Sequence, residues 1–228
     1  MSLLDKYYET IIETGYYQWL LDGFGNTLLI TLGALLIGVA IGTVIAVVKY
    51  FGEDVPVMKP LCWICDLYTT VIRGIPVVVL LLITYFIVFA SSDNGVMVAT
   101  ITFGINSGAY MAELIRGGIQ AVDRGQMEAG RSLGLSKLQT MVKIIFPQAV
   151  RYILPAIGNE MIALLKETSV AGYVAVRDVT KAGDQIRNLT YDSVSPLMTV
   201  ALTYLTLVVI MTALLNVIEK RLAKSDKG

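Results

Sequence analysis

The sequence predicts an all-α, polytopic integral membrane protein with five transmembrane helices. Hydrophobic residues make up 55% of its 228 residues, charged residues make up 16%, and the mean hydropathy is +0.68. An ordinary soluble domain carries more charge and less apolar surface than this. Stretches of about 20 mostly apolar residues, long enough to cross a bilayer as a helix, recur along the chain. We therefore expect a single transmembrane domain over residues 1–228.

Residues 1–22 are predicted to form an interfacial helix at the outer surface of the membrane. Tyr7, Ile11 and Trp19 recur near helical spacing, whereas Glu9 falls on another face. Tyrosine and tryptophan are favoured where a helix lies in the membrane interface. The segment lacks the basic start and the uninterrupted apolar core of a cleavable signal, so we expect insertion through the first spanning helix.

Five apolar windows then follow as candidate spanning helices. They lie near residues 24–48, 61–90, 96–118, 139–168 and 197–218. Pro147 and Pro155 interrupt the fourth window, which we interpret as one helix that begins near the membrane surface and kinks where proline removes a backbone donor. Residues 172–194 mix tyrosine, valine and charged residues, and we expect a short interfacial helix with an external loop there.

The positive charges beside the windows predict the orientation of the chain. If the N-terminus is outside, most lysines and arginines fall on the inner side, many of them in residues 120–147 and in the C-terminal tail. The outer segments hold only Lys6, Arg177, Lys181 and Arg187. We therefore expect an external N-terminus, and we expect residues 120–147 and the C-terminus to be cytoplasmic.

Several classes of chemistry are excluded by composition. The sequence has no histidine, which removes the Ser-His-Asp and Cys-His nucleophiles and the usual zinc sites. The net charge is zero, so there is no global basic field for nucleic acid. Cys62 and Cys65 have no second cysteine or histidine cluster to complete a metal site, and we interpret them as packing residues. We expect no catalytic residue, no metal and no cofactor on this chain.

A polar, basic loop between the third and fourth windows carries the most specific pattern. Residues Glu128 to Pro147 read EAGRSLGLSKLQTMVKIIFP. We expect Arg124–Leu138 to form a short amphipathic helix, a turn at Gly134 and a second helix that leads back to the membrane. Charged residues spaced three and four apart share one exposed face, and the small residues let a partner approach closely. The residues expected to contact a cytoplasmic partner are Arg124, Glu128, Ala129, Gly130, Arg131 and Gly134.

This loop resembles the EAA loop of the membrane subunits of ABC importers. The shared spacing is E-A-A, three residues, Gly, nine residues, Ile, any residue and Leu-Pro, with Gly130 in place of the second Ala and Phe146 in place of Leu. Other segments are similar to polar amino acid permeases, the histidine, arginine and glutamine group of type I ABC importers. They are G-x-x-N-T-L at 23–28, R-G-I-P at 73–76, S-G-A-Y-M-A-E-L-I-R-G-G-I at 107–119 and L-L-K-E-T-S-V at 164–170. Ile75 and Val170 depart mildly from the residues more frequent in that family.

The resemblance implies the transmembrane subunit of an ATP-driven amino acid importer in a bacterial plasma or inner membrane. It implies a second permease subunit, either an identical copy or a close relative, and an extracytoplasmic solute-binding protein. Two ATP-binding cassette ATPase subunits would hold the ATP and Mg, since this chain has no phosphate-binding G-x-x-x-x-G-K-[ST] loop. The loop around Glu128 would act as a cytoplasmic coupling helix that drives alternating access.

Polar side chains within the windows mark the expected substrate site, because ionisable groups inside a membrane are costly and usually functional. Asp66, Thr70 and Arg73 form one stripe, Asn106, Tyr110 and Glu113 a second, and Glu160 and Glu167 a third. We expect Arg73 to bind a substrate carboxylate and Glu113 or Glu160 to accept from an ammonium or basic side chain. The substrate-binding candidates are Thr70, Arg73, Asn106, Ser107, Tyr110, Glu113 and Glu160.

Alternatives remain open from the sequence. Arg73 with Glu113 or Glu160, and Glu113 with Arg116, are alternatively permanent ion pairs that close the helix bundle, and Glu113 suits that role better than Glu160. An ion-gradient-driven secondary transporter or channel is a second hypothesis, although it leaves the spacing of residues 128–147 unexplained. A purely structural or sensory subunit would not explain three polar stripes.

Overall fold

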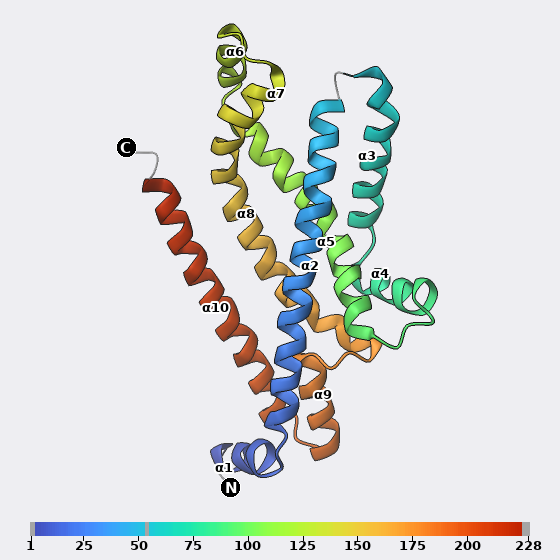
Figure 1. The fold of residues 1–228 in the computed structure, drawn as a ribbon. Coiled ribbons are helices and arrows are strands. Elements are labelled where there is room, and N and C mark those ends of the chain that lie inside the picture. The colour runs from blue at the N-terminus through green and yellow to red at the C-terminus, as the bar shows by residue number, and fades with distance from the viewer. Residues whose placement is uncertain (1–2, 53–54, 225–228) are drawn as a thin grey trace. The chain divides into compact units, whose positions relative to one another are not determined.

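The computed structural model describes residues 3–52 and 55–224, and all regular elements in these ranges are helical (Figure 1). The α-helices are α1 (Leu3–Tyr7), α2 (Tyr17–Gly52), α3 (Lys59–Gly74), α4 (Val77–Ile83), α5 (Gly95–Gln120), α6 (Arg124–Ser132), α7 (Lys137–Thr140), α8 (Phe146–Glu167), α9 (Val179–Thr190) and α10 (Val194–Lys224). Short π-helical or 3₁₀ turns join some of them: η1 (Tyr8–Glu13), η2 (Pro56–Met58), η3 (Thr84–Val88), η4 (Met141–Ile145) and η5 (Thr168–Val174). The prediction of an all-α protein is confirmed. The charge pattern predicts on which side of the membrane each chain end lies. Both ends lie outside the described residues.

Among the described residues, three helical stretches are long and apolar enough to cross a membrane. They are Tyr17–Gly52, Lys137–Val174 and Val194–Leu222. A fourth span results if Pro56–Gly74 and Val77–Val88, which meet at a bend of 105°, form one broken crossing. The remaining predicted window, residues 96–118, corresponds to α5, which contains five glycines and is not one of these stretches. The structure thus supports three or four spans, and the fifth stays a prediction.

The break between α3 and α4 falls at Gly74–Pro76. Proline disfavours helical geometry in the residue before it, so Ile75 cannot simply continue α3. Pro76 itself has an extended ψ of 134° and serves as the N-cap of α4. The 61–90 window is therefore two helices rather than one.

The N-terminal helix ends earlier than the sequence predicts. Helical structure stops at Glu13, and Gly15 has a φ of +76°, in the left-handed region that glycine tolerates best. The long helix α2 then begins at Tyr17, within the range expected for the interfacial segment. A three-residue turn, Thr14 to Tyr16 with Gly15 at its centre, thus separates the two helices.

Asp192 ties this N-terminal segment to the loop before α10. Its carboxylate lies 3.1 Å from Lys6 Nζ, and it accepts hydrogen bonds from the Thr10 hydroxyl at 3.4 Å and the Val194 N–H at 3.0 Å. Burial alone raises the pKa of Asp192. Hydrogen bonds from Ser195, Lys6 and Val194 outweigh burial and bring the pKa down from the ordinary 3.8 to about 2. Asp192 is therefore an anion at any physiological pH.

The chain divides into two compact units, and the long helices contribute to both. Unit 1 consists of Met1–Ile37, Ile75–Ile105 and Met161–Thr212. Its core combines side chains from α2, α4, α5, α8 and η5, among them Ile30, Leu81, Phe103, Leu164 and Val174. These side chains are almost fully withdrawn from solvent.

Unit 2 consists of Gly38–Gly74, Asn106–Glu160 and Ala213–Gly228. Glycines let α2 and α5 approach closely in this unit: a Cβ added at Gly42 would stand 2.4 Å from Met111 Cβ and 2.8 Å from the backbone nitrogen of Ala112. A side chain there would force the two helices apart. The rest of this unit's core packs α5 against η4 and α8.

Candidate functional site

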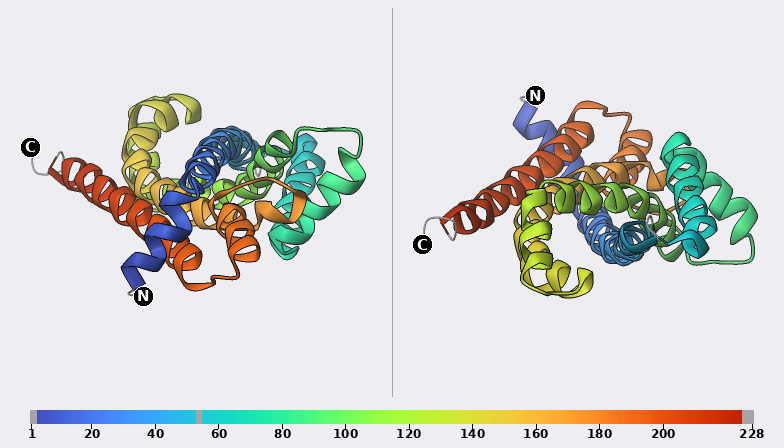
Figure 2. Two further views of the ribbon diagram at one scale, coloured as in Figure 1. Left: turned by 90° about the horizontal axis from the view of Figure 1, so that it is seen from below. Right: turned by 90° about the horizontal axis from the view of Figure 1, so that it is seen from above.

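The predicted helix-turn-helix is present in unit 2 as α6 and α7, two short helices joined by a tight turn (Figures 1 and 2). At the end of α6 the Leu135 N–H donates to Gly130 O at 3.1 Å and the Gly134 N–H donates to Arg131 O at 3.0 Å. These two bonds are those of a Schellman C-cap, and Gly134 has the left-handed φ, +85°, that this cap requires. Ser136 then begins α7 with a capping box to Gln139.

The packing around Gly130 explains why this position holds glycine in place of the second alanine of the EAA pattern. It is buried against α7 and η4, and a Cβ at this position would stand 2.4 Å from Thr140 Cγ2 and 3.2 Å from Ile144 Cδ1. The close packing of α6 therefore leaves no room for the alanine that the motif more often has. The departure serves the packing of the hairpin.

The other predicted contact residues of α6 are accessible to solvent. Arg124, Glu128, Ala129 and Arg131 are all exposed, as the helical spacing predicts. Leu133, which is 81% exposed at the tip of the turn, was not among the predicted contact residues. The available signal was an apolar residue at the C-cap of an otherwise polar helix. Together these side chains form an exposed surface, polar with an apolar tip.

Four of the predicted substrate-site residues form two pairs in unit 2. The Ser107 hydroxyl, on α5, donates to Glu160 Oε1, on α8, at 3.1 Å. The Arg73 guanidinium, on α3, lies 5.2 Å from the ring centroid of Tyr110, also on α5. Ser107 and Tyr110 are three residues apart on one helix, which makes them neighbours on the same face. Helix α5 therefore links the Arg73 contact to the Glu160 contact.

The remaining candidates occupy different environments. Asn106 is buried on α5, directly before Ser107, whereas Thr70 is exposed on α3. Arg73 forms no ion pair with any residue that the structure describes, so the permanent pairs with Glu113 or Glu160 are not observed.

Glu113 belongs to a separate charge network of unit 2. Arg116 Nε donates to its carboxylate at 3.2 Å, and Lys49 Nζ lies 3.7 Å from Glu113 and 2.6 Å from Asp66. The network joins α2, α3 and α5, and it includes the Glu113–Arg116 pair that one alternative predicts. Lys49 was missed as a member, because its partners are distant in sequence. A lysine near the end of an apolar window was the only local signal.

In unit 1 the G-x-x-N-T-L segment packs against the residues that precede α9. A Cβ at Gly23 would stand 2.6 Å from Asp178 O, the Asn26 amide donates to Arg177 O at 2.9 Å, and the Val179 N–H donates to the Thr27 hydroxyl at 3.3 Å. The glycine, the asparagine and the threonine of this segment therefore all contact the same short stretch, residues 177–179.

Asp178 is the buried centre of that contact. Its carboxylate caps α9 by accepting from the Thr180 and Lys181 N–H groups, and it accepts a further bond from the Tyr204 hydroxyl at 3.2 Å. Burial raises the pKa of Asp178, although these hydrogen bonds act in the opposite direction. The cap is one that Asp and Asn residues commonly supply at a helix start.

Comparison with known proteins identifies the family. Residues 38–224 match the family described as "binding-protein-dependent transport system inner membrane component". The chain belongs to this family.

Individual relatives agree with this assignment. The chain is 35% identical to the arginine transport system permease protein ArtQ of Bacillus subtilis, with 91% of this chain and 94% of that protein covered. It is 37% identical to the probable glutamine ABC transporter permease protein GlnM of the same organism, with 92% and 95% covered. A crystal structure of an amino acid ABC transporter with histidines has a TM-score of 0.83 and 36% identity, covering 92% of this chain and 96% of that one.

A more distant structure confirms the fold alone. An inward-facing MetNI methionine ABC transporter has a TM-score of 0.79 at 20% identity, with 90% and 97% of the two chains covered. As an inner membrane component of this family, the chain is a transport subunit and not an enzyme in its own right. The hypothesis of a secondary transporter or channel driven by an ion gradient is wrong.

Proposed function

We propose that this chain forms, together with a second permease subunit, the path by which an ATP-driven importer carries a polar amino acid into a bacterial cell. The observation that carries the proposal is the exposed α6–α7 hairpin, with its EAA spacing, between α5 and α8. A hairpin whose two helices are both capped at the turn transmits a displacement instead of absorbing it. An ATPase subunit, which holds the ATP and Mg, would grip this hairpin at Arg124, Glu128, Arg131 and the tip.

The substrate is a basic or amide amino acid. Glu160 offers the carboxylate for an ammonium or basic side chain: Ser107 occupies one of its oxygens and leaves the other to accept from a ligand. Arg73, which has no acidic partner among the described residues, offers the planar donors that match a carboxylate. Relatives named for arginine and glutamine transport favour the same substrate class.

Five spans and an external N-terminus complete the proposal. Helix α5 has 26 residues and is about 39 Å long at 1.5 Å per residue, more than the roughly 30 Å of the hydrocarbon core. With α5 as the fifth crossing, the α6–α7 hairpin and the C-terminus are cytoplasmic and α9 faces outward. A solute-binding protein would deliver the amino acid on that outer side, to a dimer of this chain or to a pair with a close relative.

Substitution of Glu160→Gln tests the substrate site. The change keeps the shape of the side chain and its bond to Ser107 but removes the charge, and a hydrogen bond to a charged group contributes about 1.5–3 kcal/mol. Uptake of arginine by the complete complex in proteoliposomes should therefore require about 10- to 150-fold more substrate. Glu219→Gln on α10 is the matched charge control and should leave uptake unchanged.

Assembly is measured in parallel by co-purification of the ATPase. Normal co-purification with impaired arginine uptake supports the role of Glu160. Unchanged arginine uptake in Glu160→Gln would refute that role.

A further inference from the structure

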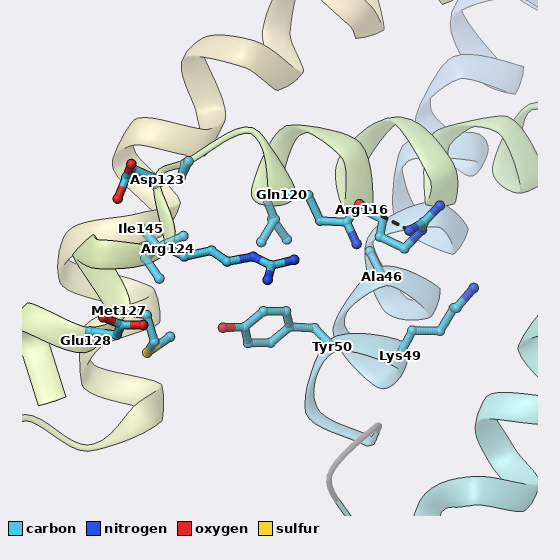
Figure 3. Close-up of a pocket in the computed structure, with 12 residues that line it drawn as sticks. Ala46, Lys49, Tyr50, Arg116, Gln120, Asp123, Arg124, Met127, Glu128 and Ile145 are labelled. Carbon is cyan, nitrogen blue, oxygen red and sulfur yellow. Dashed lines mark hydrogen bonds between the residues drawn. The ribbon is translucent and has the colours of Figure 1, made fainter.

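Unit 2 contains a cavity of about 550 Å³ at the ends of α2 and α5, beside α6 (Figure 3). Part of its wall is apolar, with Ala46, Ile119 and Ile145 among the lining residues. None of the substrate-binding candidates lines it. The cavity is therefore distinct from the site around Glu160.

Arg124 is one of the side chains that line the cavity. Figure 3 shows it reaching from the first turn of α6 toward Tyr50 and Gln120. Arg124 has no hydrogen bond or ion pair with any residue in the part of the chain that the structure describes. Its neighbour Asp123 points away and accepts from the Gly125 N–H at 2.7 Å. A guanidinium with five donors thus faces the cavity without an acceptor.

The other charged groups of the lining set the sign of the cavity. Lys49 and Arg116 are cationic, and Asp123 and Glu128 are anionic, so with Arg124 the lining holds three cations and two carboxylates. Lys49 and Arg116 are both bound to Glu113, outside the lining. Asp123 is already bonded to the Gly125 N–H as the N-cap of α6. Glu128 is therefore the one lining carboxylate that forms no bond with a described residue. The lining residues alone sum to a charge of +1, and the carboxylates of Glu113 and Asp66 outside the lining pair with Lys49 and Arg116. Arg124 is therefore the lining cation that has no acidic partner among the described residues.

Neutral donors add to this arrangement. Arg116 Nη1 donates to Gln120 Oε1 at 3.2 Å. This bond uses the oxygen of the Gln120 amide, and the NH₂ group of the same amide is still able to donate. The Tyr50 hydroxyl also lies on the cavity, as Figure 3 shows. A guanidinium, an amide and a hydroxyl around an apolar wall suit a tetrahedral oxyanion carried by an amphipathic molecule.

We propose that this cavity binds a phosphate group, with Arg124 as its principal ligand. The sources of a phosphate at this place are the head group of an anionic phospholipid and free phosphate. The phospholipid is favoured because the cavity has an apolar wall and lies at helix ends, and basic pockets at such positions on the cytoplasmic side bind anionic head groups. The choice of leaflet rests on the proposed orientation, whereas the phosphate site itself does not.

Such a ligand would act on the coupling hairpin. Arg124 is the first residue of α6, while Tyr50 and Gln120 belong to the ends of α2 and α5. A phosphate bound by all three joins the start of α6 to both of these ends. Anionic lipid would thereby fix the position from which α6 transmits movement.

Thermal shift of the full-length protein in an uncharged detergent tests the proposal. The probes are dioctanoyl phosphatidylglycerol, dioctanoyl phosphatidylcholine as the zwitterionic control, and sodium phosphate. At a concentration 100-fold above its Kd, the anionic lipid should raise the Tm by roughly 5–10 °C. Phosphatidylcholine should give a much smaller rise.

Variants assign the shift to Arg124. Arg124→Gln should lower the affinity for the anionic lipid at least tenfold, and Arg124→Lys, which keeps the charge but not the planar donors, should lower it less. Arg131→Gln removes the same charge from the same helix outside the cavity, and it should keep the wild-type shift. A shift by sodium phosphate alone that Arg124→Gln abolishes supports the site and assigns it to soluble phosphate.

Two results would overturn the proposal. One is an equal shift with phosphatidylcholine and phosphatidylglycerol. The other is an Arg124→Gln variant whose shift equals that of the wild type. Neither result bears on arginine uptake by Glu160→Gln, so failure of the phosphate site is distinguishable from failure of the proposed transport function.

Discussion

Replacement of Gly23 by alanine tests the packing of α2 against the stretch before α9. A Cβ at Gly23 would stand 2.6 Å from Asp178 O, 2.7 Å from Asp178 C and 2.9 Å from Val179 N. All three are backbone atoms, so no side-chain rotation can relieve the overlap. The two segments would have to separate.

The cost follows from the contacts that such a separation breaks. Overpacking of a well-packed interface costs about 1–3 kcal/mol. Loss of the Asn26–Arg177 and Thr27–Val179 hydrogen bonds adds about 0.5–1.5 kcal/mol each, and the helix gains about 0.5–1 kcal/mol from replacing glycine by alanine. The net destabilisation is about 1–5.5 kcal/mol. At roughly 3 °C per kcal/mol, the Tm should fall by roughly 3–16 °C.

Gly25 provides the matched control on the same helix. A Cβ at Gly25 meets no atom within 4 Å, so Gly25→Ala should gain the helix propensity alone and raise the Tm slightly. Thermal unfolding of both purified variants is followed by tryptophan fluorescence. A Gly23→Ala protein as stable as the wild type, or equal losses at the two positions, would refute the packing argument.

Two further predictions concern the hairpin and the N-terminal segment. Gly134→Trp forces a bulky residue into a φ of +85° at the turn after α6, so ATP hydrolysis by the complex should continue while uptake falls sharply. Paired ATPase and uptake assays measure this, and normal uptake would contradict the coupling role of the turn. The folded-state pKa of Asp192, about 2, lies below its ordinary value of 3.8, so its stabilising contribution is full above about pH 4 and disappears as the pH falls through 2. The Tm of the wild type should exceed that of Asp192→Asn by a constant amount above pH 4, and the difference should vanish near pH 2; a difference independent of pH would argue against the ion pair with Lys6.

Local patterns predicted the hairpin well because its determinants are close together in sequence. The spacing of Arg124, Glu128 and Arg131 defined an exposed face, and Gly134 marked the turn. The role of Gly130 was not predictable, because its packing against Thr140 depends on how α6 folds back on α7.

Long-range contacts account for most of what the sequence could not predict. The charge network at Lys49 joins α2 to residues that are distant in the sequence, and no local sequence pattern indicates it. The bond between Ser107 and Glu160 likewise requires α5 and α8 to meet. The polar stripes suggested Arg73, Tyr110 and Glu160 as candidates, but the pairing among the candidates came from the structure.

The side of the membrane on which the α6–α7 hairpin lies is the most direct test of the central claim, that an ATPase grips it from the cytoplasm. Arg131→Cys, in a protein whose Cys62 and Cys65 are replaced by alanine, is exposed to a membrane-impermeant maleimide in intact cells and in inside-out vesicles. Labelling only in the inside-out vesicles is the predicted result. Labelling of intact cells would place the hairpin outside, beyond the reach of any cytoplasmic ATPase, and would contradict the coupling mechanism.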